Sequence, residues 1–165
     1  KFIIFKIGNK LVGEKVLQDG KKTALVIQEN ADKAIEILSK NENGFVLIVE
    51  CGRIDGASHD GDIVKMTEQV KMLDKTLRVI LNFMRSNDET MVIATADHET
   101  GGLVIGEGEM NNSWFTDTSS NTEGKHYHTP QDVKLYAFGT KSKIFDNKNI
   151  DNTDIFKIMK EQLGL

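Results

Sequence analysis

The stretch Thr90-Met-Val-Ile-Ala-Thr-Ala-Asp-His-Glu-Thr-Gly-Gly102 passes directly from apolar residues to polar ones. Its first half is a run of apolar and small residues, which is typical of a strand buried in a parallel sheet. An adjacent acid and imidazole, Asp97-His98, follow this run at once. We therefore expect a buried strand over residues 90–96 that carries these two polar side chains at its carboxyl end.

The same order of elements occurs earlier in the chain. Residues 44–50 form a continuous apolar run ending in Glu50, which is typical of a parallel strand buried on both faces. The sequence then predicts a loop over residues 51–61. From 62 to 86, apolar residues recur mostly at steps of three and four, which predicts a helix. Strand, helix and strand in succession predict a right-handed crossover and a parallel sheet.

The remaining segments extend this α/β pattern. Runs of β-branched and aromatic residues predict strands, and apolar residues at helical spacing predict helices. The expected strands are 2–7, 103–105 and 133–138, with two more short strands within 10–28; helices are expected from Asn30 to about Asn43-Gly44 and from Asn152 onward, and a loop over 106–127. The fold class is therefore α/β, a mostly parallel sheet flanked by helices, in a single domain over residues 1–165.

Composition excludes several classes of protein. The chain has 165 residues, of which 39% are hydrophobic, and this is enough for one core of ordinary size. A net charge of −4 gives no electrostatic case for binding nucleic acid. No apolar run approaches the roughly 18–20 residues that a membrane span needs, so no span is expected. The single cysteine, Cys51, excludes an internal disulfide and is expected to be a small buried residue without a redox role.

Polar side chains cluster where the predicted strands begin or end. They are Glu50, Asp55 and His59 after one strand, Asp97 and His98 after another, and His126 and His128 before a third. In an open parallel sheet, ligands bind beyond the carboxyl ends of the strands, so the first two clusters should be neighbours. Imidazole and carboxylate groups suit zinc, manganese or iron(II). The pattern therefore favours a transition-metal site at this edge.

Each of these residues also has a structural interpretation. An aspartate at a strand end, such as Asp97, is often a cap or turn former. Asp55 and His59 are also compatible with loop residues that bond to their own backbone. Glu50 is harder to explain, because a buried carboxylate costs several kcal/mol unless it is paired or bound to metal. Arg53 is the alternative partner for Glu50.

Three motifs, in this order, resemble the C-terminal half of an alkaline phosphatase. They are Phe45-Val-Leu-Ile-Val-Glu-Cys-Gly-Arg-Ile-Asp-Gly-Ala-Ser-His59, Thr95-Ala-Asp-His-Glu-Thr-Gly-Gly102 and His128-Thr-Pro-Gln-Asp-Val133. The resemblance covers about residues 30–163 and leaves residues 1–29 unassigned. It implies an α/β sandwich of which this chain is an incomplete half, and a phosphomonoesterase that uses two zinc ions and one magnesium ion.

The resemblance also implies six metal ligands. It assigns Asp55, His59 and His128 to the first zinc, Asp97 and His98 to the second zinc, and Glu50 to the magnesium. His126 lies outside the motifs and is not expected to be a ligand. Paired metal ions can stabilise both the attacking and the leaving oxygen of an in-line displacement at phosphorus.

One part of the family pattern does not occur in this chain. The nucleophilic serine of the family follows an aspartate, and no Asp-Ser dipeptide occurs in the 165 residues. Ser58 is a turn residue by its context and not a substitute. We therefore expect the nucleophile outside this chain, in an N-terminal half supplied in cis or in trans, and we expect the isolated chain to be an inactive fragment.

The resemblance implies hydrolysis of phosphate monoesters through a phosphoserine intermediate, with inorganic phosphate as product. It suggests a periplasmic or extracellular location and leaves a homodimer open. Two alternatives remain at this point. One is a related metallohydrolase, namely a phosphodiesterase, a phosphomutase or a sulfatase. The other is a non-catalytic metal-binding fragment.

Overall fold

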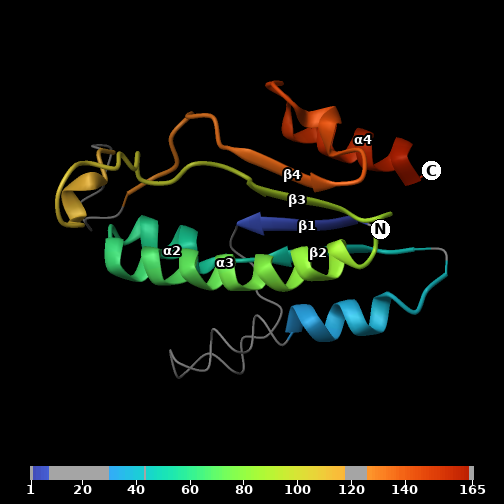
Figure 1. Ribbon diagram of the computed structural model, residues 1–165. Helices are drawn as coiled ribbons and strands as arrows, with labels where there is room; N and C mark the ends of the chain where they lie inside the picture. Colours follow the sequence, from blue (N-terminus) through green and yellow to red (C-terminus); the bar gives the residue numbers. More distant parts are fainter. Residues whose placement is uncertain (1, 8–29, 43, 118–125, 164–165) are drawn as a thin grey trace.

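The computed structural model of the chain describes residues 2–7, 30–42, 44–117 and 126–163. These residues form a four-stranded sheet with helices on both of its faces, which confirms the predicted α/β class (Figure 1). The two short strands expected within residues 10–28 lie outside the described residues. No helix of the described part is long and apolar enough to cross a membrane.

The sheet is mostly parallel, as predicted. Its strands are β1 (Phe2–Ile7), β2 (Val46–Glu50), β3 (Met91–Ala96) and β4 (Leu135–Gly139), in the order β2-β1-β3-β4. β1 is parallel to β2 and to β3, whereas β4 is antiparallel to β3. The helix between β2 and β3 is α3 (Ile63–Arg85). The two strands that α3 connects are therefore not neighbours, because β1 lies between them.

The strand register brings several chain segments to one edge of the sheet. Lys6 of β1 pairs with both Glu50 of β2 and Thr95 of β3, so the carboxyl ends of these three strands are level. Because β4 runs in the opposite direction, its first residue, Leu135, pairs with Thr95. The segment before β4 therefore enters the sheet at this same edge, where the segments after β2 and β3 leave it.

One face of the sheet is covered by α3 and by a helix over residues 30–38. Their contact with the strands is centred on Ile80, Val92 and Phe45. The long helix begins and ends close to its predicted limits, and the Asp62 side chain caps it by accepting a hydrogen bond from Lys65 N (3.0 Å). The helix over residues 30–38 ends at residue 38, before the Asn43-Gly44 pair where its end was expected.

The opposite face of the sheet is covered only in part. The final helix, α4 (Asn152–Leu163), packs with Met91 and Ile93 of β3, as Figure 1 shows beside β4. Ile48 of β2 points to this same face, and its side chain is 60% exposed. The expectation that β2 is buried on both faces is therefore wrong. Among the described strands β2 lies at the edge of the sheet, and the described cluster formed with α4 does not include its side chains.

Two predictions between the strands also need correction. Residues 51–61 are not a loop throughout, because α2 (Arg53–His59) forms within them. Packing of Ala57 of α2 against the first turn of α3 stabilises this helix despite the glycines around it. The strand expected over 103–105 is only an isolated bridge between Leu103 and Phe115. The described part of the segment 106–127 is irregular, apart from the short helix η2 (Asn112–Trp114).

Candidate metal centre

Asp55 and His59 lie on α2, four residues apart. Residues at this spacing occupy the same face of a helix, one turn from each other. Asp55 is buried, with 3% of its surface exposed, and His59 is half-buried. The Nδ1 atom of His59 is 2.5 Å from the carbonyl oxygen of His126, which can only accept, so this nitrogen donates. The other ring nitrogen, Nε2, therefore carries the free lone pair and lies 3.4 Å from Asp55 Oδ1.

His128 joins these two residues from the segment before β4. Its Nε2 atom is 3.1 Å from His59 Nε2 and 3.6 Å from Asp55 Oδ1. We call Asp55, His59 and His128 the first cluster. Among the described residues, it is the one group of three or more His, Cys, Asp or Glu side chains whose ligand atoms lie within 4.8 Å of one another.

The spacing within the first cluster suits a tetrahedral zinc ion. Zinc bonds of about 2.0–2.1 Å place two ligand atoms of a tetrahedral site about 3.3 Å apart. The three distances in the cluster are 3.1, 3.4 and 3.6 Å. In addition, Asp55 Oδ2 is buried and accepts no hydrogen bond from any described residue. A buried carboxylate oxygen is costly in this state, and a cation would compensate it.

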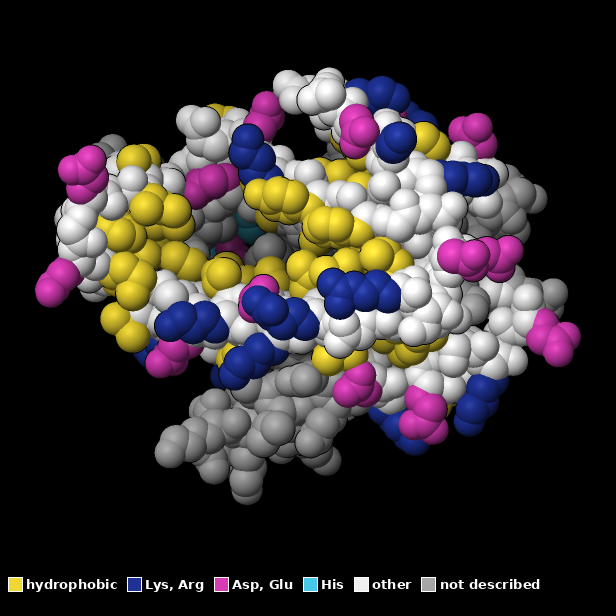
Figure 2. Space-filling view, viewed as in Figure 1, with side chains coloured by type: hydrophobic (Ala, Val, Ile, Leu, Met, Phe, Trp, Pro, Cys, Tyr) yellow, Lys and Arg dark blue, Asp and Glu magenta, His cyan; other side chains and the backbone are white. Residues whose placement is uncertain are grey.

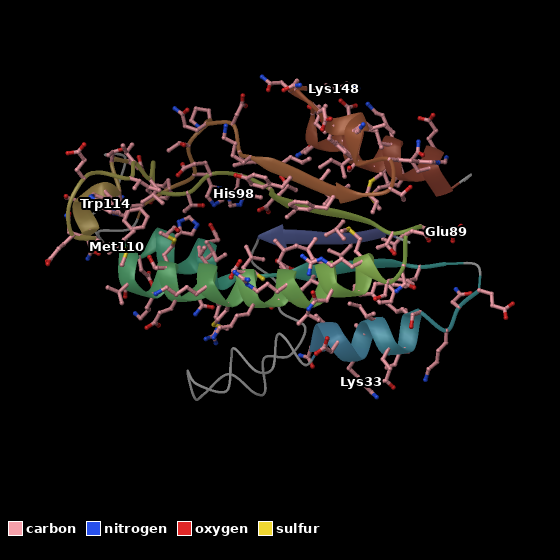
Figure 3. The ribbon with its side chains drawn as sticks, viewed as in Figure 1. Lys33, Glu89, His98, Met110, Trp114 and Lys148 are labelled. Carbon is pink, nitrogen blue, oxygen red and sulfur yellow. The ribbon has the colours of Figure 1, made fainter. Side chains whose placement is uncertain are left out.

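Asp97 and His98, which we call the second cluster, follow β3 directly. Both are half-buried, and Asp97 Oδ2 lies 3.6 Å from His98 Nε2. The His98 ring stacks on the ring of His128, with 3.5 Å between centroids, so the two clusters touch. Figure 3 shows His98 at the end of β3, facing α2. No third ligand residue of the described part completes a group around the second cluster.

Glu50 is the sixth candidate ligand. It is half-buried at the end of β2, and it is not part of the group of three around Asp55. Arg53, its alternative partner, is exposed at the start of α2. The neighbouring Cys51 is buried, and burial together with the charge of Glu50 raises the pKa of its thiol to about 11. The thiol is therefore protonated near neutral pH and is a poor ligand.

Three further residues connect the clusters, and the sequence interpretation did not single them out. Thr100 donates a 2.7 Å hydrogen bond to Asp55 Oδ1, and its hydroxyl lies 3.3 Å from His98 Nδ1. Glu99 accepts hydrogen bonds from Gly102 N and from Leu103 N, and Thr129 donates its hydroxyl to the same carboxylate. Burial opposes ionisation of Glu99, but these hydrogen bonds outweigh it and lower the pKa of the carboxyl. The only signal in the sequence is the glycine pair that follows Glu99-Thr100.

His126 and Ser58 have structural contacts. The His126 ring lies against Phe115, with 5.4 Å between ring centroids, and its carbonyl oxygen orients His59. The Ser58 hydroxyl donates to Ile54 O at 2.9 Å within α2. Its hydroxyl is therefore engaged by the helix that carries it.

A polar cavity of about 710 Å³ opens beside the second cluster. It is lined by Asp97 and His98, by Thr129 and the segment after it, and by residues 147–152, which lead into α4. In the space-filling view, a histidine side chain is visible inside a hollow of the surface (Figure 2). A small polar ligand can therefore reach the second cluster from solvent.

Comparison with known proteins identifies relatives of this chain. The sequence model of the alkaline phosphatase family matches residues 13–127, beginning within the segment 1–29. The alkaline phosphatase of Escherichia fergusonii is 30% identical over 156 residues, covering 87% of this chain and 33% of the relative. This chain thus spans about a third of that relative's length.

Solved structures show the same fold. A cold-active alkaline phosphatase from the psychrophile Shewanella sp. superposes with a TM-score of 0.70 at 22% identity, over 90% of this chain and 52% of that one. A mutant of the alkaline phosphatase TAB5, with Mg bound in its M3 site, superposes with a TM-score of 0.68 at 20% identity, over 97% and 52% of the two chains. The family match, which covers most of the chain, confirms the resemblance inferred from the three motifs. The chain belongs to the alkaline phosphatase family.

Proposed function

We propose that the protein hydrolyses phosphate monoesters at a centre of two zinc ions and one magnesium ion, in which this chain holds the first zinc through the first cluster. The observation that carries this proposal is the convergence of three ligand atoms, from Asp55, His59 and His128, within 4.8 Å of one another. Family membership gives the reaction class, and the orphaned buried Oδ2 of Asp55 supports a cation at this position.

We further propose that Asp97 and His98 hold the second zinc and that Glu50 contributes to the magnesium site. Their support is positional. Glu50 and the second cluster stand at the carboxyl edge of the sheet, where β1 separates them by one strand. The relative with Mg in its M3 site makes a magnesium ion in this family reasonable. Both ions need further ligands in addition to those that this chain supplies.

When bound, the zinc ions would supply Lewis acidity that stabilises the oxygens entering and leaving phosphorus. Other residues of this chain orient the candidate ligands. The His126 carbonyl fixes the ring of His59 with Nε2 toward Asp55, and Thr100 donates a hydrogen bond to Asp55 Oδ1. The cavity beside the second cluster admits the phosphate monoester and releases inorganic phosphate.

We propose that the nucleophilic serine comes from polypeptide outside these 165 residues, in cis or in trans. Its oxygen would attack phosphorus as the ester P–O bond breaks, which gives a phosphoserine and an alcohol. Water would then cleave the phosphoserine to inorganic phosphate and free serine. The incompletely covered sheet face around Ile48 supports further packing against this chain, by the remaining half of the fold or by a second copy of the chain. The family favours a periplasmic or extracellular location for such an enzyme.

The test measures p-nitrophenyl phosphate hydrolysis by this chain with zinc and magnesium, alone and mixed with a polypeptide carrying the Asp-Ser half of a family member. We expect turnover only in the mixture. The diester bis-p-nitrophenyl phosphate and p-nitrophenyl sulfate serve as competing substrates. Diester turnover equal to monoester turnover would contradict the proposed reaction. Zinc-dependent turnover by the chain alone would contradict an external serine, and zinc binding without turnover in any mixture would favour a non-catalytic metal-binding role.

A further inference from the structure

We infer that Glu99 is a positioning residue that holds His128 in the first cluster, through Thr129. This inference rests on the proposed metal centre. It concerns how one ligand is kept in place, and it begins from the environment of His128. That residue lies in a segment without helix or strand, and its side chain is 46% exposed. The ring contacts His98 and His59, but no helix or strand fixes the backbone that carries it.

The two residues that flank His128 are both bonded to the turn at residues 99–103. On one side, the Tyr127 carbonyl oxygen accepts a hydrogen bond from Gly101 N at 2.8 Å. On the other side, the Thr129 hydroxyl donates to Glu99 Oε2. The turn thus holds the backbone on both sides of His128. One of these two bonds is a backbone bond, and the other depends on the Glu99 side chain.

Glu99 is itself fixed by the turn that it stabilises. Its Oε1 accepts from Leu103 N and its Oε2 accepts from Gly102 N, both at 3.1 Å. Hydrogen bonds to an ionised carboxylate are stronger than those between neutral groups. The carboxylate therefore closes the turn and, through the same oxygen that binds Gly102, holds the segment that carries His128.

The turn also fixes the second cluster, because Glu99 directly follows His98. The Glu99 side chain therefore adds a link between the end of β3 and the segment before β4, next to the pairing of Thr95 with Leu135. At the same place the His98 ring stacks on the His128 ring, with centroids 3.5 Å apart. The Thr129 backbone also bonds to Glu99, so loss of the hydroxyl bond should loosen this side of His128 without releasing it, while Asp55 and His59 stay on α2.

The decisive variant is Thr129→Val, which removes the hydroxyl and nearly preserves the shape of the side chain. We expect zinc affinity to fall by about 10- to 100-fold, the usual effect of losing a partner that orients a metal ligand. Thr129→Ser keeps the donor and should restore most of the affinity, which a merely steric role of Thr129 would not predict. Glu99→Gln should weaken zinc binding in the same direction, and Glu107→Gln, in an exposed position of the same loop, should not.

A second readout is independent of metal. In the metal-free chain, the histidine ring signals in NMR spectra should change for His128 in Thr129→Val and return in Thr129→Ser, whereas those of His126 should stay the same. Unchanged His128 signals and unchanged zinc affinity in Thr129→Val would overturn the inference. If the wild-type chain binds no zinc, the proposed metal centre fails, and the NMR comparison still decides whether Glu99 positions His128.

Discussion

The two clusters at the carboxyl edge of the sheet are assembled differently. The first cluster takes its ligands from two segments that lie about 70 positions apart in the chain, α2 and the segment before β4, and the fold brings their ligand atoms to within 3.6 Å. The second cluster consists of two consecutive residues at one strand end, without a third described ligand. Under the proposed function, this chain would therefore supply three protein ligands for one metal ion and only part of the ligand set for another.

The difference has a physical origin in the elements that carry the ligands. A helix fixes two side chains at a spacing of four on one face, and the antiparallel return into β4 adds the third ligand at the same edge. Asp97 Oδ2 and His98 Nε2 lie 3.6 Å apart, close enough to share one ion, but two ligand atoms alone do not surround it. They need a ligand from another segment.

The largest expected effect comes from His128, compared with its near neighbour His126. We predict that His128→Ala lowers zinc affinity by more than about 100-fold, because it removes a direct ligand and not only an orienting partner. His126→Ala should change the affinity by less than about threefold, because its contribution to the site is a backbone carbonyl. Isothermal titration calorimetry measures both. Equal losses in the two variants would remove His128 from the ligand set.

The next effect concerns the turn that holds His128. A Cβ at Gly101, where φ is +85°, would lie 2.6 Å from a ring carbon of Phe115. Gly101→Ala should therefore cost about 1–3 kcal/mol of unfolding free energy and should also weaken zinc binding. Gly108→Ala is the matched control, since its φ is +92° but nothing lies within 4 Å. Urea denaturation measures the free energy of unfolding of both variants. If Gly108→Ala loses as much unfolding free energy as Gly101→Ala, the close contact with Phe115 is not the cause.

The second cluster gives a smaller effect in the chain alone. We predict that a second metal ion binds more weakly than the first and that Asp97→Ala abolishes this second event. The affinity of the first site should change by less than about tenfold, because Asp97 is not among its ligands. Asp88→Ala, an exposed aspartate before the opposite end of β3, is the control. Equilibrium dialysis over a range of zinc concentrations distinguishes the two sites. Loss of the tight site in Asp97→Ala would mean that the clusters share one ion.

The smallest effect is expected at Cys51. Because its pKa is raised to about 11, the thiol is protonated at about pH 7.5 and offers no thiolate to a metal ion. Cys51→Ser should therefore change zinc affinity by less than about twofold. The rate of reaction with a disulfide reagent should also be low in the folded chain and rise on unfolding. A large loss of zinc affinity in Cys51→Ser would make the thiol a ligand.

Much of the architecture could be predicted from the sequence. Apolar periodicity located α3, and the apolar run before Asp97 located β3, because both signals are local. The exposure of β2 could not be predicted, since an apolar run does not reveal whether its strand lies at the edge or the centre of a sheet. The helix at Arg53–His59 was missed because its stability comes from packing on α3, and its glycines suggest a loop.

The candidate site shows the same limit. The six candidate ligands could be named in advance because the motifs resemble those of a known family, and their assignment stays a prediction. The bond between Glu99 and Thr129 joins residues that are 30 positions apart, and no periodic pattern connects them. Contacts of this kind follow from the fold and cannot be predicted from local sequence.

The zinc stoichiometry of the wild-type chain directly tests the difference between the two clusters, and native mass spectrometry after dialysis against micromolar zinc measures it. We predict one tightly held zinc per chain, because among the described residues only the first cluster brings three candidate ligand atoms together. A chain that retains no zinc would contradict the proposed centre. A chain that retains two zinc ions equally tightly would contradict the distinction between the clusters.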